Sequence, residues 1–450
     1  MFDSPAALVI AAYLLAMLAI GALGRRIKGL EGFHLAGRNI KLVHLTGTFC
    51  ASIIGASSTL GMAGLGFSSG LPGAWWMLSG TAGLLVLAAF FAKRVRESGC
   101  FTLPELVGSF YGDTSRIAAS ILIVVSWIGV IAAQILAAGK VLGAVMGGEE
   151  MLFMAACTAV FVIYTVHGGQ GSVVRTDLVQ LLIILTGMAF LFSRGLESSG
   201  PGLLLDQSFP TSAGMDGWQV LSMLAIVGSA YLVGPDLHSR MLSSHSPREA
   251  RASAALSALI LIPLSFLITS LGIFARDLYP AASAEQAILV LMTGLLSPAL
   301  QGLVAAAMLA AFMSSADTSL MTATSILTLD LFRKAFPNSS EQRLMAVSRL
   351  FVAVLGFSAL ALAASSPSII QTLMIAYTVF TSGLLFPVIA GFYKGRLGLT
   401  PSGALAALVG GGITAVLFGQ SYPLLGMAVS VALLFGISWL ERRLWRQDGV

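Results

Sequence analysis

Residues 310–325, AAFMSSADTSLMTATS, place hydroxyl side chains and one carboxylate, Asp317, in the middle of a long apolar segment. A charged Asp at the centre of a bilayer costs about 2.5–3.5 kcal/mol, so Asp317 is expected to face protein, water or a cation. Ser and Thr hydroxyls also bond to carbonyls one turn back in ordinary helices. A row of hydroxyls beside an acid instead favours an ion-binding face, and the i, i+3, i+4, i+7 spacing builds that face from Ala311, Ser314, Ser315 and Thr318.

The composition predicts an all-α polytopic membrane protein. The chain has 450 residues, of which 57% are hydrophobic and only 10% are charged, and its mean hydropathy is +0.90. A soluble domain carries about 25% charged residues. A bilayer core of about 30 Å needs roughly 20 apolar residues of helix. This length predicts about 13 transmembrane helices, near residues 5–24, 42–67, 70–94, 115–146, 150–167, 172–195, 216–235, 251–276, 298–332, 343–365, 367–392, 402–419 and 422–441.

Lys and Arg residues predict the orientation, because short cytoplasmic loops carry an excess of them. With the N-terminus outside, 22 of the 25 Lys and Arg residues fall in inner loops or the C-terminal tail. They include the cluster RRIK at 25–28 and Arg240, which we assign to the inner loop 240–251. The chain starts MFDSPAALVI, with an acid where a cleavable signal has a basic residue. We therefore expect an integral protein of the cell (inner) membrane, with its N-terminus outside and its C-terminus cytoplasmic.

Other function classes are disfavoured by the sequence. It contains no phosphate-binding loop of the form GxxxxGK[ST], so a pump with its own nucleotide site is not expected. The three cysteines, Cys50, Cys100 and Cys157, are scattered and suggest neither a disulfide framework nor a metal site. We expect no enzyme activity, no cofactor beyond a coupling ion, no nucleic-acid partner, and function as a monomer surrounded by membrane lipid.

Two predicted helices contain helix-breaking residues. The segment 42–67 is rich in glycine, and the segment 216–235 ends in Gly234 and Pro235, followed by Asp236. Pro removes a backbone donor, and freed backbone groups are tolerated in a membrane only where they line a protein cavity. Gly-rich helices also pack closely on neighbours, but breaks that recur five helices apart are typical of inverted-repeat transporters.

This repeat pattern divides the chain into five parts. They are a first helix with its inner loop (1–41), a first five-helix repeat (42–195), an outer loop (196–215), a second five-helix repeat (216–392) and two C-terminal helices with the cytoplasmic tail (393–450). Because five is an odd number, the two repeats are expected to have opposite orientations in the membrane.

Five stretches together resemble the sodium:solute symporters, the family of the sodium/proline, sodium/glucose, sodium/sialic acid and choline transporters. Residues 310–332 look like its signature helix, and CASIIGASSTLGMAGLGFSSG (50–70) resembles its first broken helix. The remaining three are FTLPELVGSFYG (101–112), HGGQGSVVRTDLVQLLIILTG (167–187) and VGPDLHSRMLSSHSPREAR (233–251). The resemblance implies a fold similar to that of LeuT, with five plus five helices in an inverted repeat.

The resemblance also implies where sodium binds. A main site is expected from three carbonyls and two hydroxyls, those of Ala51, Ile54, Ala311, Ser314 and Ser315. Some members bind a second sodium, which carries over to Asp177, Ser314 and Thr318, with Asp317 where those members usually have Ser. The extra carboxylate of Asp317 either strengthens that second site or carries a proton. From the residues alone, Asp177 is equally interpreted as an interfacial acid that pairs with Arg175 or caps its helix.

The substrate is less determined by the sequence than the ion site. The resemblance places the solute near the midplane, between the broken helices and two others, and the candidate residues there are Ser57, Ser58, Trp127, Gln134, Ser229, Tyr231 and Tyr377. We expect no Arg at the centre of any span, so a multiply charged anion would lack a bidentate partner. The family's sugar transporters carry Gln where Ser58 falls. These features favour a small zwitterion or monocarboxylate, such as an amino acid or osmolyte, with a quaternary amine as the aromatic alternative.

Three functions remain open at this stage. The first is sodium-coupled symport of a small polar solute by alternating access. The second is proton-coupled transport that uses Asp317 and Asp177. The third, an ion channel lined by the polar helix faces, is the least favoured.

Overall fold

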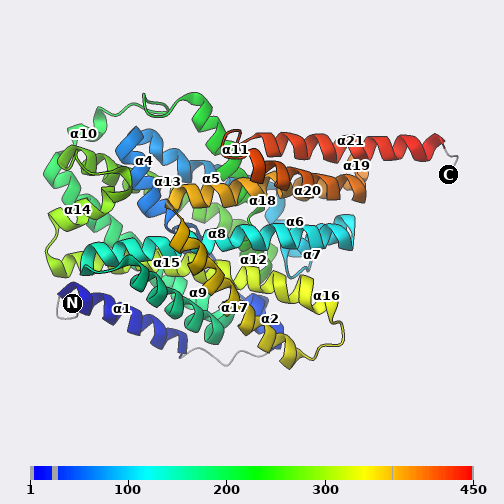
Figure 1. Ribbon diagram of the computed structural model, residues 1–450, viewed down its shortest axis with the longest axis horizontal. Coiled ribbons are helices and arrows are strands. Elements are labelled where there is room, and N and C mark those ends of the chain that lie inside the picture. The colour runs from blue at the N-terminus through cyan, green and yellow to red at the C-terminus, as the bar shows by residue number, and fades with distance from the viewer. Residues whose placement is uncertain (1–4, 23–28, 367, 448–450) are drawn as a thin grey trace.

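The computed structural model describes residues 5–22, 29–366 and 368–447, and in this part of the chain the fold is a bundle of helices (Figure 1). Most helices run along the long axis of the molecule. Helix α1 begins at one end of the bundle and α21 ends at the other (Figure 1). The basic cluster predicted for residues 25–28 lies outside the described residues.

The longer helices follow the predicted apolar segments. They are α1 (Pro5–Ala22), α3 (Leu42–Ile53), α4 (Met62–Ser69), α5 (Trp75–Val86), α8 (Asp113–Met146), α9 (Glu150–Ser199), α11 (Gly217–Val233), α12 (Pro235–Ser243), α13 (Pro247–Leu278), α14 (Ala287–Leu295), α15 (Pro298–Ile326), α17 (Glu341–Ser365), α18 (Ile369–Gly391), α20 (Pro401–Phe418) and α21 (Leu425–Gln447).

Shorter helices connect or extend these. They are α2 (Gly29–Leu35), η1 (Ala36–Arg38), η2 (Ser57–Gly61), η3 (Leu71–Ala74), η4 (Leu87–Phe91), α6 (Ala92–Glu97), α7 (Leu103–Tyr111), α10 (Gly202–Leu205), η5 (Ala284–Gln286), η6 (Leu327–Phe332), α16 (Arg333–Ala335) and α19 (Lys394–Leu397). Three of them, η2, η4 and η6, are π-helical turns that continue longer helices.

The number of long apolar helices in the structure is lower than the predicted number of about 13 spans. Among the described residues, 10 helices are long and apolar enough to cross a membrane, or 11 when the bent pair Leu42–Ile53 and Ser57–Ser69 counts as one. The apolar part of α1, Pro5–Ile20, is shorter than this criterion requires. Helix α9 contains two predicted spans, which are separated by Gly169 at φ 53° and ψ −169°. A straight 50-residue helix would be about 75 Å long, more than twice the bilayer core.

Helix α13 packs very closely against α4, the second half of the bent pair. A Cβ atom on Gly272 would lie 1.8 Å from the Ala63 carbonyl oxygen, and one on Gly66 would lie 2.1 Å from the Thr269 carbonyl oxygen. Both glycines are therefore required for the two backbones to approach each other. This contact holds α4 at its bend relative to α3.

A buried histidine joins the short helix α2 to α17 and to α15, the helix that contains the signature stretch 310–325. His34 Nδ1 lies 2.8 Å from the Ser325 hydroxyl of α15, and the Ser348 hydroxyl of α17 lies 3.2 Å from His34 Nε2. The His34 side chain is only 1% exposed, and burial lowers its pKa from 6.5 to about 3. The imidazole is therefore neutral at physiological pH.

Two charged residues near the ends of long helices, Lys140 and Asp330, form ion pairs with other elements. Lys140 Nζ lies 2.5 Å from Glu285 Oε2, which joins α8 to η5. Arg116 Nη2 lies 2.5 Å from Asp330 Oδ1, which joins α8 to η6 at the C-terminal end of the signature helix. The first pair is partly exposed, whereas the Asp330 side chain is fully buried.

Replacing Gly272 by Ala is expected to lower the thermal stability of the purified protein. The added methyl group would overlap the α4 backbone, and overpacking of this kind costs about 1–3 kcal/mol. The matched control is Gly436→Ala on α21, where a Cβ meets nothing within 4 Å. Equal melting temperatures for the two variants would contradict the close contact.

The pH dependence of stability should report the burial of His34. Below about pH 6.5 the unfolded chain binds a proton that the folded protein does not, so stability should fall by about 1.4 kcal/mol per pH unit as the pH decreases toward 3. His34→Gln should therefore show a smaller loss of melting temperature between about pH 7 and pH 5 than the wild type. His245→Gln is the control, because His245 is exposed and bonds to Asn39; an identical slope in all three proteins would contradict this role.

Candidate functional site

The first break in the bundle lies between α3 and η2, where the chain bends by 65°. Ile54 has extended backbone angles, φ −82° and ψ 93°, so the helical ladder stops there. Polar side chains replace the missing backbone bonds. Ser58 Oγ donates to the Ile53 carbonyl at 2.8 Å, and Gln134 Oε1 accepts from the Ala56 amide at 2.8 Å.

Gly55 is required at this break because neighbouring side chains approach its backbone. A Cβ atom at this position would lie 2.6 Å from Ser315 Oγ and 2.8 Å from Gln134 Oε1. Any larger residue would therefore push α15 or α8 away from the break.

The five predicted main-site residues come together around this break, and we call them the oxygen cluster. Ser314 Oγ donates to the carbonyls of Ala51 at 2.8 Å and Ala311 at 3.0 Å. Ser315 Oγ lies 3.3 Å from the Ile54 carbonyl and also 3.0 Å from that of Ser52. The cluster joins α3 to α15, and both hydroxyls are buried.

The chemistry of the oxygen cluster suits a monovalent hard cation. Its members are carbonyl and hydroxyl oxygens, which are neutral, and hard cations prefer oxygen ligands. Within the ranges that the structure describes, no group of three or more His, Cys, Asp or Glu residues is placed to hold a metal ion. Each of the three carbonyls is hydrogen-bonded to one of the two serine hydroxyls, so a cation that binds there would take the place of the serine protons.

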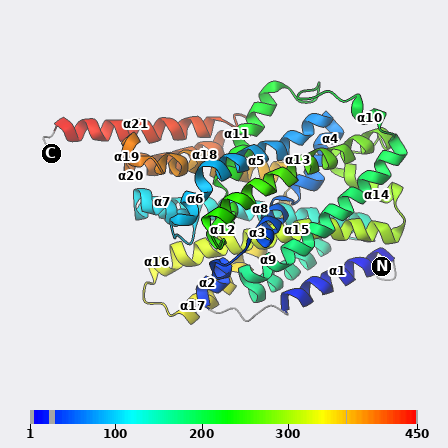
Figure 2. The ribbon, with the colours of Figure 1, turned by 180° about the vertical axis from the view of Figure 1, so that it is seen from behind.

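The second break separates α11 from α12. Gly234 and Pro235 interrupt the helix, and His238 Nδ1 lies 2.9 Å from the Gly234 carbonyl. Helix α12 lies beside α3 and α15 near the centre of the bundle (Figure 2). Helix α12 therefore contacts both helices that form the first break and its surroundings.

The predicted second ion site is organised around Arg240, and the sequence-based expectation for the location of this residue is wrong. Arg240 does not lie in the inner loop but in α12, inside the apolar span Gly217–Ser243, and its side chain is 0% exposed. Arg240 Nη2 lies 3.5 Å from Asp177 Oδ2, 3.1 Å from Ser52 Oγ, and in contact with Thr318 Oγ1. Asp177 therefore pairs with Arg240 and not with Arg175.

The other two residues predicted for the second site point elsewhere. Asp317 Oδ1 accepts from Thr165 Oγ1 of α9 at 2.9 Å. Ser314 is directed to the oxygen cluster. Asp177 also accepts a short hydrogen bond from Thr48 of α3. Of the four predicted residues, Asp177 and Thr318 thus meet at Arg240, whereas Asp317 and Ser314 bond to other partners.

The predicted substrate residues fall into two sets: polar side chains that bond to the backbone at the first break, and aromatic side chains that pack on one another. Ser58 and Gln134 are engaged by the break in α3. Tyr377 lies 6.0 Å from Phe380 between ring centroids, and Trp127 lies 4.9 Å from the same Phe380. Tyr231 packs over Gly80 of α5 and is within hydrogen-bonding reach of Ser58. Ser57 and Ser229 are also buried, without a side-chain bond that joins them to these rings.

Trp76 is an aromatic residue that the sequence analysis missed. It lies on α5 and stacks on Tyr377 with a centroid distance of 6.4 Å. The indole Nε1 atoms of Trp76 and Trp127 are buried and have no hydrogen-bond partner in the described part of the chain. The WW pair at 75–76 was its only signal, because helical contacts across the bundle are not visible in a sequence. We call Trp76, Trp127, Tyr377 and Phe380 the aromatic cluster.

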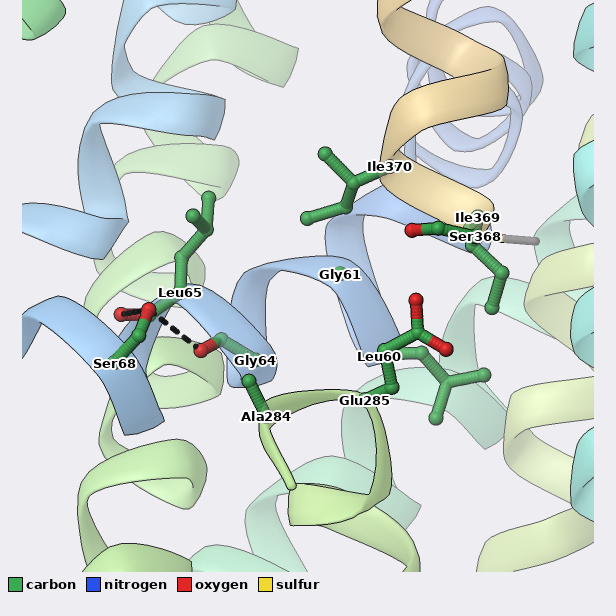
Figure 3. A pocket seen from close by; sticks show the side chains of 10 residues that line it. All are labelled: Leu60, Gly61, Gly64, Leu65, Ser68, Ala284, Glu285, Ser368, Ile369 and Ile370. Atoms are coloured by element: carbon green, nitrogen blue, oxygen red, sulfur yellow. Dashed lines mark hydrogen bonds between the residues drawn. The ribbon is translucent and has the colours of Figure 1, made fainter.

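A separate cavity of about 110 Å³ lies beside α4. Figure 3 shows it between Gly61 and Gly64 on one side and Ala284, Glu285 and Ile370 on the other. Its wall is mostly apolar, and none of the predicted site residues lines it. Side chains of Ile370 and the backbone of Ala284 close directly on the two glycines.

Comparisons with known proteins give consistent results. The sequence model of the "Sodium:solute symporter family" matches residues 33–411. The sodium/proline symporter of Escherichia coli is 25% identical over 445 residues, which cover 93% of this chain and 88% of that protein. The sodium/glucose cotransporter of Vibrio parahaemolyticus is 26% identical over 363 residues, covering 72% and 67% respectively.

A solved structure supports the same fold. A Na⁺-coupled sialic acid symporter, in a substrate-bound outward-open state, matches with a TM-score of 0.82 at 18% identity, over 98% of both chains. The predicted fold class, an all-helical membrane protein with a LeuT-like fold, is therefore confirmed.

Removing both hydroxyls of the oxygen cluster is expected to weaken sodium binding by at least tenfold, about 1.4 kcal/mol. The double variant Ser314→Ala with Ser315→Ala would be titrated with sodium chloride against choline chloride, with thermal stability as the readout. Ser319→Ala is the control, because Ser319 is buried on the same helix but lies outside the oxygen cluster. Unchanged sodium affinity in the double variant would contradict the site.

Proposed function

We propose, since the chain belongs to the sodium:solute symporter family, that sodium binding at the oxygen cluster drives uptake of a small zwitterion or monocarboxylate. The coarser function follows from the family: the protein is a sodium-coupled solute symporter, a transporter and not an enzyme, and an integral membrane protein with many spans. The finer points are the ion ligands, the solute class and the orientation in the membrane.

The observation that carries the ion site is the contact between α3 and α15. Hydrogen bonds join Ser314 to the carbonyls of Ala51 and Ala311, and Ser315 to that of Ile54, and both hydroxyls can turn their lone pairs toward a cation. A bound sodium would tie the broken helix to the signature helix. Losing it would release α3 from α15, which is the relative movement that alternating access requires.

The aromatic cluster supports the proposed solute class. Its two unpartnered indole N–H groups can donate to a carboxylate, and its ring faces can pack on an apolar or cationic portion of the same molecule. None of the seven candidate substrate residues is charged. The buried Arg240 is held by Asp177 and so is not free to bind an anionic solute.

The proposed orientation places the N-terminus outside and the C-terminus in the cytoplasm of the cell (inner) membrane. The positive-inside distribution of Lys and Arg supports it. Helix α1 begins at one end of the bundle and α21 ends at the other, which is compatible with this orientation (Figure 1). The five-part division of the chain, with repeats at 42–195 and 216–392, is likewise part of this proposal, as is function as a monomer.

A proton-coupled carrier is the second candidate, and a specific observation favours it. Asp177 and Asp317 are both buried near one guanidinium, so two carboxylates share a single compensating charge. A proton on Asp317 would remove that imbalance. A sodium ion at the neighbouring oxygen cluster would also reduce it.

Reconstituted protein separates these functions. Proteoliposomes would be given a sodium gradient, a proton gradient or neither, with candidate solutes chosen by a thermal-shift screen run with and without sodium. Solute uptake that saturates and requires the sodium gradient is expected. Uptake driven equally by a pH gradient without sodium would favour the proton carrier, and current without any solute would favour a channel.

Trp127→Phe should weaken solute binding and leave sodium binding intact. A hydrogen bond to a charged group contributes about 1.5–3 kcal/mol, so loss of the indole donor should raise the apparent Kd for the solute about ten- to a hundredfold. Trp439→Phe is the control, because Trp439 is exposed on α21. Equal solute affinities in both variants would exclude Trp127 from the binding site.

A further inference from the structure

An open cavity of about 430 Å³ lies between α8, α17, α18 and α20. A second cavity, of about 330 Å³, continues it between α18 and α20, and both are lined by Gln371, Ile375 and Val416. We call the joined space the side groove. Each cavity has the size of a ligand pocket, about 300–1,000 Å³. None of the residues proposed above for the ion or the solute lines the side groove.

The side groove opens on a face of the bundle that the bilayer covers. Three of its apolar side chains are exposed, Val125 of α8 by 62%, Ile375 of α18 by 42% and Val416 of α20 by 65%. Each of these three helices is long and apolar enough to cross a membrane. Exposed apolar side chains within such helices face hydrocarbon and not water. The molecules that can enter the groove from this face are therefore membrane lipids.

Small residues make the side groove deep and apolar. Its floor contains Gly129 of α8 and Ala376 of α18, and a Cβ atom on Gly129 would lie only 3.2 Å from the Ala376 Cβ atom. The hydroxyls of Ser126 and Thr372 also line the groove, but each donates to a carbonyl one turn back in its own helix. The walls therefore present methyl and methylene groups, which suit a hydrocarbon chain.

The polar side chains of the side groove lie at one end of its helices. Ser365 and Ser366 end α17, Gln371 is in the first turn of α18, and Gln420 follows the end of α20. Val379 of α18 also lines the groove, and it lies about 12 Å farther along that helix than Gln371. The groove thus runs from polar groups at the helix ends toward the middle of a bilayer core of about 30 Å.

The polar end of the side groove is uncharged. None of the described residues that line the two cavities is Asp, Glu, Lys or Arg. Anionic headgroups are bound by clusters of Lys and Arg, so this end gives them no advantage. The exposed carboxamides of Gln371 and Gln420 can both donate and accept hydrogen bonds. They match a headgroup that carries a phosphate and an ammonium group together.

We propose that the side groove binds one phospholipid with a zwitterionic headgroup, whose acyl chain lies along α18 and whose headgroup meets Gln371 and Gln420. The proposal concerns a lipid site and does not depend on which ion or solute the protein carries.

The bound lipid would stabilise the packing of α8 and α18. Ser126 and Ala376, which line the side groove, directly precede Trp127 and Tyr377 of the aromatic cluster. Atoms that line an empty space lose dispersion contacts, and an acyl chain restores them. A lipid that binds the folded protein also raises its melting temperature.

Native mass spectrometry of the purified, full-length protein tests the proposal. The protein in detergent is titrated with dioleoylphosphatidylethanolamine, which is zwitterionic, or with dioleoylphosphatidylglycerol, which is anionic. The groove variant is Ile375→Trp with Val416→Trp, which places bulk in both cavities. The control variant is Leu259→Trp with Leu350→Trp, at exposed positions of α13 and α17 outside the groove.

We expect the wild type and the control to bind one phosphatidylethanolamine roughly tenfold more tightly than the groove variant does. They should also prefer it to phosphatidylglycerol, and this lipid should raise the melting temperature of these two proteins only. Equal binding by the groove variant and the control would overturn the site, and equal affinity for phosphatidylglycerol would overturn the headgroup assignment.

Other occupants give distinct results, and each would overturn the proposal. One is binding of detergent only. Another is a dimer that the groove variant loses and that phosphatidylethanolamine does not dissociate, which would show that a second copy of the chain covers the groove. If the groove variant does not fold, a phosphatidylethanolamine with a photoreactive acyl chain decides on the wild type. Labelled peptides should come from α8, α18 and α20, and labelling spread evenly over the exposed helices would contradict the site.

Discussion

The central constraint on this structure is that backbone polar groups inside a membrane must find partners within the protein. Two helices are interrupted, after Ile53 and after Val233. Each break frees carbonyls and amides at the depth where water is scarce. The structure pairs them with side chains from other helices, and the positions of α8 and α15 follow from that requirement, because Gln134 and Ser315 both reach the first break.

The same requirement explains why we propose the first break as an ion site. Carbonyls that leave a helix converge with their oxygens pointing into one space, and serine hydroxyls hold them there by donating hydrogen bonds. A cation offers these carbonyls a stronger partner than a hydroxyl proton. The serines then change role, from donor to ligand, by rotation about a single bond. Little backbone rearrangement is needed, so the site is largely preorganised before the ion arrives.

The sequence predicted the parts of this site that depend on local spacing. The helical period placed Ser314 and Ser315 on one face, and the glycine and proline pattern located both breaks. The family resemblance then supplied the matching carbonyls of Ala51 and Ile54. These inferences succeed because a helix face is determined by residues within two turns of each other.

Features that depend on contacts between distant helices were not predictable in this way. Arg240 was assigned to a loop, because Lys and Arg residues next to an apolar span are typical of cytoplasmic loops. Only the tertiary structure shows that α12 directs it against Asp177, which is 63 positions away in the sequence. Trp76 was missed for the same reason. The lower count of membrane-spanning helices treats α9 as one element, although non-helical backbone angles at Gly169 separate the two spans that hydropathy predicts there.

The proposed oxygen cluster consists of neutral oxygens, so a sodium ion bound there would carry its full charge across the membrane together with the solute. The membrane potential contributes about 2.3 kcal/mol per charge at 100 mV, which corresponds to roughly fortyfold accumulation of a neutral solute. Each further ion that travelled with the same solute molecule would multiply that factor again. The number of sites built from neutral oxygens therefore sets the limit on how steeply the solute can be concentrated.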